Sequence, residues 1–144
     1  MIAGFIQAVV DAMSPPQQAG SKRIDRRVLS SLVPTSDGFV KVTDRDYKRV
    51  DRAALERFLQ FNRVDRRVYR KTANDCDDFA YILMGDVTRW DSDLAFGIAM
   101  VSRPSGRHAL NCFVGLDMQM YLVEPQTDEI FTVPDDWHVY FLLF

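Results

Sequence analysis

Apolar residues recur at helical spacing in several parts of this chain. Steps of three and four residues predict amphipathic helices over residues 2–13, 52–61 and 77–90. A shorter helix is expected over residues 24–33. Asp51 is placed to cap the helix that starts at residue 52. The helical signals therefore lie mainly in the first two thirds of the chain.

The last third of the chain is typical of strands. Five apolar segments separated by polar turns predict strands over residues 95–102, 108–116, 118–124, 129–133 and 138–144, after an earlier short strand at residues 39–43. Their connections hold no predicted helix, and parallel crossovers need one, so an antiparallel sheet is expected. The sequence thus predicts an α+β fold, with helices packed on one side of an antiparallel sheet.

One domain over residues 1–144 is expected from the length. It would comprise an N-terminal helix over residues 1–13, a helical and loop extension over residues 14–64, and a core over residues 65–144. Proline, glutamine, glycine and serine in residues 14–24 indicate a linker at the start of the extension.

Composition restricts the class of protein. The chain is 47% hydrophobic and 12% aromatic, as in ordinary globular proteins. No run approaches the ~20 apolar residues of a membrane span. Residues 1–13 lack the flanks of a secretory signal, which predicts synthesis in the cytoplasm. Their polar face carries no Lys or Arg, so core packing is favoured for this helix, with a homo-oligomer formed through residues 2–13 as the second option.

The net charge of −2 hides an asymmetry. Residues 22–71 hold 15 of the 18 Lys and Arg but 7 of the 20 acidic residues, for a net charge of +8. Residues 72–144 hold 3 basic and 12 acidic residues, for a net charge of −9. A basic surface for nucleic acid or phosphate is one interpretation. Attraction between the two halves, or solvated faces, is favoured because no stacking aromatics alternate with the arginines.

The candidate chemistry centres on the segment NDCDDFA at residues 74–80. Cys76 stands at the expected start of a helix, where unpaired N–H groups and the helix dipole stabilise a thiolate. The alternative is a small buried hydrophobe, the usual fate of a free cysteine and the one expected for Cys112. Acids on both sides of Cys76 favour the reactive interpretation.

An imidazole and a carboxylate follow downstream. His108 starts a strand whose even positions share one face, and it could reach Cys76 if that face packs on the helix. His138, the other histidine, has no comparable partners. Glu124 ends the next strand and could orient the imidazole, as the third member of a triad does. A solvent-exposed acid at the strand end is the alternative for Glu124.

Carboxylates beside Cys76 would raise the pKa of its thiol unless something positive offsets them. A Ca²⁺ ion held by Asp77 and Asp78 would do so, because hard cations take oxygen ligands. The two acids could equally serve only the helix dipole. Zinc is disfavoured because the chain has no paired Cys or His spacing.

Three short motifs resemble the papain-like domain at the C-terminus of the fungal Marasmius agglutinin. They are DCDDFA at residues 75–80, HALN at 108–111 and EPQ at 124–126, within a resemblance that covers about half the chain. Members of that family are calcium-activated cysteine proteases with a Cys-His-Glu triad.

The resemblance implies a papain-like fold with Cys76 as nucleophile, His108 as base and Glu124 as orienting acid. It also implies an activating Ca²⁺ or Mn²⁺ on Asp77 and Asp78. Residues 1–64 have no counterpart to the lectin part of that agglutinin, so sugar binding is not implied.

The oxyanion donor departs from the family pattern. Papain-like enzymes often place a Gln shortly before the cysteine, and residues 69–73 contain none. Gln126, Asn111 or the backbone N–H of Cys76 would have to support the oxyanion.

The predicted function is a metal-dependent thiol protease or amidase acting on a peptide or amide substrate, without a nucleic-acid partner. The alternative is a catalytically inactive domain of the same fold, serving as a structural or binding component of a phage or multi-subunit assembly. A weaker third option is acyl transfer to an amine.

Overall fold

A computed structural model describes residues 18–34 and 37–144. The helix predicted over residues 2–13, with the self-association expected of it, lies outside the described residues. No helix in the described part is long and apolar enough to span a membrane.

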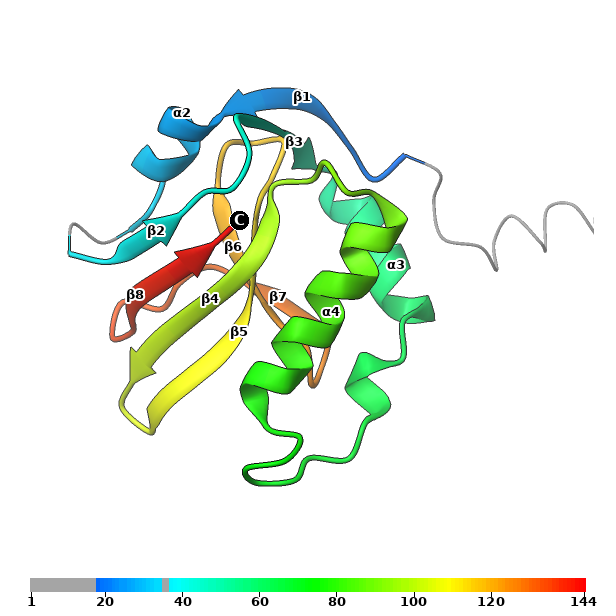
Figure 1. The fold of residues 1–144 in the computed structure, drawn as a ribbon, viewed down its shortest axis with the longest axis vertical. Helices are drawn as coiled ribbons and strands as arrows, with labels where there is room; N and C mark the ends of the chain where they lie inside the picture. Colours follow the sequence, from blue (N-terminus) through cyan, green and yellow to red (C-terminus); the bar gives the residue numbers. More distant parts are fainter. Residues whose placement is uncertain (1–17, 35–36) are drawn as a thin grey trace, which may run out of the picture.

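The described chain contains four helical segments and eight strands, with a six-stranded sheet at its centre (Figure 1). The elements run β1 Gly20–Asp25, α2 Arg26–Ser31, β2 Phe39–Lys41, β3 Asp46–Val50, α3 Arg52–Phe61, η1 Val64–Arg66, α4 Cys76–Trp90, β4 Phe96–Arg103, β5 Gly106–Val114, β6 Met120–Glu124, β7 Glu129–Phe131 and β8 His138–Leu143. The central sheet has the order β2-β8-β4-β5-β6-β7, and β1 pairs with β3 in a separate ribbon. Mixed helices and a mostly antiparallel sheet confirm the α+β class.

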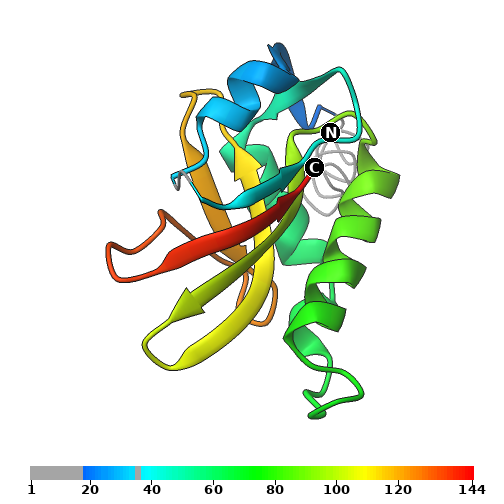
Figure 2. The same ribbon diagram turned by 60° about the vertical axis from the view of Figure 1, so that its left-hand side comes forward.

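The sheet separates two apolar clusters. The side chains of α3 and α4 pack on one face, against Phe96, Phe113 and Val123. On the other face Leu110 and Cys112 pack with residues from α2, β3 and β8. Two views about 60° apart show α4 running along one side of the sheet, with α2, β1 and β3 at its upper end (Figure 2).

The strongest periodic signals gave the right elements. Helix α3 begins after Asp51, whose Oδ1 accepts a hydrogen bond from the backbone N–H of Ala54 at 3.2 Å. The predicted helix 77–90 is present as α4, one residue longer at its start. These segments succeed because their apolar stripes match the face that each one buries.

The prediction of a helical and loop extension over residues 14–64 was wrong in part. The described portion of the expected linker contains β1, which pairs antiparallel with β3, a strand that the pattern did not predict. Both strands are mostly polar in sequence, so neither shows the strict alternation of apolar and polar residues that reveals a half-buried strand. The predicted helix 24–33 shortens to α2 because β1 takes its first residues.

An antiparallel sheet was expected, but one pair of strands in the sheet is parallel. Strand β2 pairs parallel with β8, with Phe39 opposite Phe141. Almost one hundred residues separate the two strands, so the rest of the fold, not a single helical crossover, connects them.

Candidate functional site

The site begins where the chain turns into α4. Asp75 caps the helix, and Asp78 Oδ2 accepts a hydrogen bond from the Asp75 backbone N–H at 3.2 Å. Asp75 Oδ2 accepts from the backbone N–H of Thr72 at 3.3 Å. Acids at a helix N-terminus are stabilised by its unpaired N–H groups, so capping alone accounts for part of this cluster.

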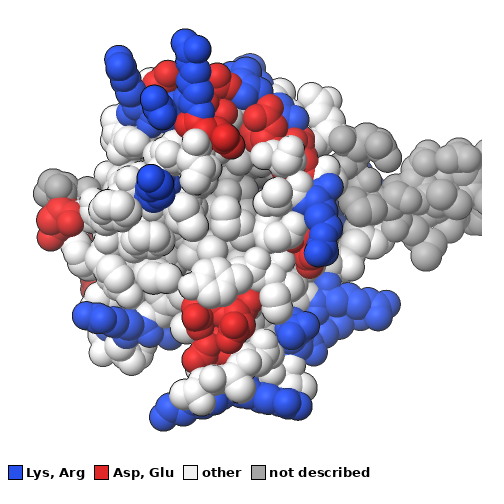
Figure 3. Space-filling view, viewed as in Figure 1, with Lys and Arg blue, Asp and Glu red and all other residues white. Residues whose placement is uncertain are grey.

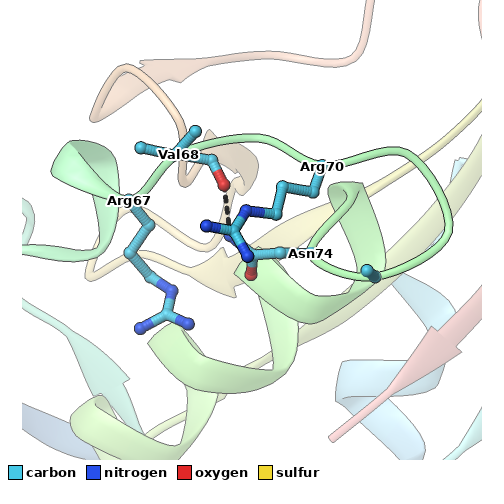
Figure 4. Close-up of a pocket in the computed structure, with 5 residues that line it drawn as sticks. Arg67, Val68, Arg70 and Asn74 are labelled. Atoms are coloured by element: carbon cyan, nitrogen blue, oxygen red, sulfur yellow. Dashed lines mark hydrogen bonds between the residues drawn. The ribbon is translucent and has the colours of Figure 1, made fainter.

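The loop before α4 is closed by its own hydrogen bonds. The backbone N–H of Arg70 donates to the carbonyl of Asn74 and the N–H of Asn74 donates back, both at 2.8 Å. Asn74 Nδ2 donates to the carbonyl of Val68 at 2.6 Å (Figure 4). Thr72 takes a positive φ of 65° at the tip of the turn. The backbone of this loop is therefore fixed before any ligand arrives.

This loop borders a pocket of about 430 Å³, lined by Arg67, Val68, Arg70, Ala73 and Asn74. Two guanidinium groups border the same hollow (Figure 4). Neither arginine has a hydrogen bond or ion pair from its side chain within the described residues. The pocket therefore presents two positive, planar donors to solvent.

Three carboxylates lie together just past the pocket. One oxygen from each of Asp75, Asp77 and Asp78 falls within 4.8 Å of the others. Acidic residues are visible between groups of Lys and Arg on this face of the molecule (Figure 3). An all-oxygen donor set of this size fits a hard cation such as Ca²⁺ or Mn²⁺. The residues present thus suit the predicted ion.

Cys76 is the first residue of α4 and is partly buried. In the described part of the chain, no hydrogen bond joins its sulfur to His108 or Glu124. The helix start was predicted correctly.

His108 and Glu124 do meet. His108 Nε2 and Glu124 Oε2 are joined by a 2.6 Å hydrogen bond, with side chains only 6% and 15% exposed. Glu124 Oε1 also accepts from the backbone N–H of Gln126 at 3.3 Å. The solvent-exposed alternative for Glu124 is therefore wrong. Gln126 enters this network through its backbone.

The side of β5 that meets α4 is not the one bearing His108. Asn111 and Phe113 face α4, whereas Leu110 and Cys112 belong to the cluster on the opposite face. His108 is paired across the ladder with Val101, which lies in that second cluster. We expected the face of β5 that bears His108 to pack on α4. In the middle of the strand the opposite face packs there instead.

Asn111 is fully buried and ties α4 to the sheet. Its Nδ2 donates to the carbonyl of Ala80 at 2.9 Å and to that of Gly97 at 3.1 Å. A donor already shared between two carbonyls serves packing first.

The other predicted residues behave as follows. Cys112 is fully buried, as expected, and burial raises the pKa of its thiol far above the usual range. His138 is about half exposed, and its Nε2 lies 3.7 Å from Asp37 Oδ1. Because the basic residues 63–71 show no clean apolar period in the sequence, the pocket of Arg67 and Arg70 was not predicted. Their spacing of three was the available signal.

Comparisons with known proteins place this geometry in context. No protein-family model and no curated protein matches the chain. Solved structures do match, among them the following two. One is PSL1a in complex with E64, with a TM-score of 0.77 and 25% identity over 85% of this chain and 51% of that one. Another is a lectin of Polyporus squamosus bound to Neu5Acα2-6Galβ1-4GlcNAc, with a TM-score of 0.74 and 25% identity over 85% of this chain and 49% of that one.

The fold is thus that of an α+β domain found in fungal lectins. The chain spans about half the length of the lectin chains that it resembles. The expected resemblance to a fungal agglutinin is confirmed at this level, and no finding supports a protease domain.

The comparisons contradict the predicted enzyme. The similar structures are lectins, so the assignments as a hydrolase, cysteine peptidase or amidase with a peptide substrate are wrong. The enzyme prediction was wrong because it relied on the order of three residue types along the chain. A Cys, a His and a Glu in the right order do not by themselves define a nucleophile system. Among the three predicted triad residues, which are all described, only His108 and Glu124 are joined by a hydrogen bond.

Proposed function

We propose that this chain is a carbohydrate-binding domain whose pocket, formed by Arg67, Val68, Arg70, Ala73 and Asn74, takes an acidic sugar. The observation that carries the proposal is the pair of guanidinium groups bordering one preformed hollow. A guanidinium donates two parallel N–H bonds to a carboxylate, and sialic acid carries one carboxylate. The Polyporus squamosus lectin bound to a sialylated trisaccharide supports this class of ligand.

The loop is suited to binding because its backbone is already ordered. The paired hydrogen bonds between Arg70 and Asn74 hold the turn in one conformation. Binding of a ligand therefore requires little further loss of conformational entropy from this loop. Next to the arginines, Val68 and Tyr69 are 70% and 51% exposed. They offer an apolar contact for the carbon face of a sugar ring.

The acidic cluster supports a second part of the proposal, a Ca²⁺ or Mn²⁺ ion on Asp77 and Asp78 with Asp75 as a third ligand. The ion would neutralise the carboxylates next to the pocket and lower their repulsion of an anionic sugar. We also propose that the Cys-bearing helix packs on the sheet as in a papain-like fold. This part of the proposal includes no hydrolytic activity. Cys76, His108, Glu124, Gln126 and Asn111 stay predicted site residues.

Calorimetric titration with the trisaccharide Neu5Acα2-6Galβ1-4GlcNAc tests the glycan proposal. The expected result is binding of this glycan and at least about tenfold weaker binding of Galβ1-4GlcNAc, which lacks the carboxylate. Arg67→Ala and Arg70→Ala should each weaken binding by about ten- to a hundredfold, the value of a lost hydrogen bond to a charged group. Arg26→Ala, an exposed arginine on α2, is the matched control. Equal affinity for the two glycans would exclude the pocket as an acidic-sugar site.

The cation is tested separately, with Ca²⁺ alone as the titrant. Asp77→Asn keeps the hydrogen bond between Asp78 and Asp75 and removes one negative ligand, so Ca²⁺ binding should weaken at least about tenfold. Asp136→Asn, an exposed acid far along the chain, should leave it unchanged. Heat of binding that is identical in wild type and Asp77→Asn would remove the cation from the proposal.

A further inference from the structure

The segment that leads into α4 forms one end of the molecule (Figure 1). Its residues 66–71 read RRVYRK and are all exposed, and we call them the cationic loop. Val68 is the most exposed large apolar side chain in the described part of the chain, at 70%, and its neighbour Tyr69 is 51% exposed. Exposed apolar groups that lie together with a polar rim mark an interaction site.

The fold holds these two apolar side chains at the surface. The ring of Tyr69 stacks on that of Phe79, with 6.4 Å between the ring centroids, and Phe79 is almost fully buried in the core. The carbonyl of Val68 accepts the hydrogen bond from Asn74 Nδ2. The cationic loop therefore presents Val68 and one side of Tyr69 to a partner without rearranging.

Positive charges surround the apolar pair. The cationic loop contains Arg66, Arg67, Arg70 and Lys71, and no hydrogen bond or ion pair joins their side chains to an acid among the described residues. Lys and Arg side chains are seen along the lower edge of the molecule (Figure 3). The charge of this end is therefore available to an anionic partner.

The acids nearest in sequence lie behind the cationic loop, at the start of α4. Asp75, Asp77 and Asp78 are each partly buried, whereas all residues of the loop are exposed. Asp75 and Asp78 accept hydrogen bonds from the backbone N–H groups of Thr72 and Asp75, so their carboxylates are turned toward the chain itself. A partner that approaches the end of the molecule meets the cations first.

We propose that the cationic loop docks on the surface of an anionic lipid bilayer. Val68 and Tyr69 would enter the boundary between headgroups and acyl chains, where apolar side chains and amphipathic rings are favoured. The four cations would lie against the anionic headgroups. Nucleic acid fits this surface less well, because a base stacks on an aromatic ring and one side of Tyr69 is already occupied by Phe79. This inference goes beyond the proposed function and needs no sugar.

Sedimentation with lipid vesicles tests the proposal. The whole chain is mixed with vesicles of phosphatidylcholine, with or without about 30% phosphatidylserine, in about 50 mM salt. The buffer contains EDTA and the vesicles carry no glycan, so the result is independent of the cation and glycan titrations. Wild type should bind the anionic vesicles at least about tenfold more tightly than the neutral ones, and about 500 mM salt should remove the difference.

Charge reversal locates the contact. Arg67 and Arg70 also border the pocket, so Arg66→Glu combined with Lys71→Glu is the variant of choice. Each cation near an anionic membrane is worth about fivefold in affinity, so this variant should bind at least about twentyfold more weakly. Arg26→Glu with Arg27→Glu makes the same change in net charge on exposed positions of α2, away from the loop, and should stay within about threefold of wild type.

The apolar contact is tested by Val68→Ser. The side chain is 70% exposed, so its replacement should leave Tm unchanged but weaken vesicle binding at least about threefold. Val28→Ser, at a 43% exposed position on α2, is the matched control and should bind like wild type.

Several results would overturn the proposal. They are equal binding to neutral and anionic vesicles, equal losses in the two charge-reversal variants, and unchanged binding by Val68→Ser. Binding of single-stranded oligothymidine without binding of vesicles would instead identify the cationic loop as a nucleic-acid surface. If vesicles bind as expected but Neu5Acα2-6Galβ1-4GlcNAc does not, the proposed function fails and the lipid surface stands.

Discussion

The sequence allows more than one role for several side chains of this protein, and their hydrogen-bond partners in the structure distinguish between these roles. Asn111, expected to support an oxyanion, donates to two buried carbonyls, one on α4 and one on β4. Glu124, which could have been a solvent-exposed acid, is bound to His108 and to the turn that follows it. Residue type alone does not distinguish these uses, because each depends on atoms supplied by distant segments.

The role of Asn111 in packing can be tested directly. Asn111→Ala would leave the carbonyls of Ala80 and Gly97 without this donor inside the core, so a loss of about 2–3 kcal/mol in the free energy of unfolding is expected. Gln60→Ala, an exposed position on α3, should change stability by less than about 0.5 kcal/mol. Denaturant titration measures both. A loss for Asn111→Ala no larger than the control's would show that water satisfies these carbonyls.

At the level of elements, close backbone approach fixes how the strands fit. A Cβ added to Gly97 on β4 would lie 2.0 Å from the carbonyl oxygen of Leu143 on β8. No real side chain tolerates that distance, so the backbone of one strand would have to move. Gly85, on the exposed side of α4, has no atom within 4 Å of such a Cβ.

These two glycines therefore give opposite predictions for one substitution. Gly97→Ala should destabilise the fold by more than about 3 kcal/mol, since the core resists displacement of a central strand. Gly85→Ala should stabilise it by about 0.5–1 kcal/mol, because alanine is the better helix former. Chemical unfolding of both variants is the measurement, and equal effects at the two sites would contradict the close approach of β4 and β8.

At the level of the whole molecule, opposite charges join the basic and acidic halves of the chain. Arg23 Nη1 lies 2.6 Å from Asp93 Oδ2, and Lys48 Nζ lies 2.5 Å from Asp91 Oδ2. The favoured interpretation of the charge asymmetry, attraction within one fold, is therefore seen in the structure. The arginines of the pocket are a separate matter, because they belong to the basic half and border an open hollow.

Much of the framework was accessible from the sequence. Helices α3 and α4 and strands β4 to β8 could be predicted because each buries an apolar face whose period appears in the residues themselves. The start of α4 could be predicted because Asp75 and Asp78 form a local cap, which needs no distant partner. Local sequence patterns were sufficient for these elements.

Only the tertiary structure decided which of these residues act together. Strands β1 and β3 are mostly polar, so their pairing with each other defines them. Packing decides which face of β5 meets α4. As a result, Asn111 contacts the helix, whereas His108 belongs to the opposite face of the strand. The pocket of Arg67 and Arg70 depends on a loop closed by hydrogen bonds, and the hydrogen bond between His108 and Glu124 joins residues 16 positions apart. Such contacts arise from chain folding in three dimensions, and no periodicity along the chain records them.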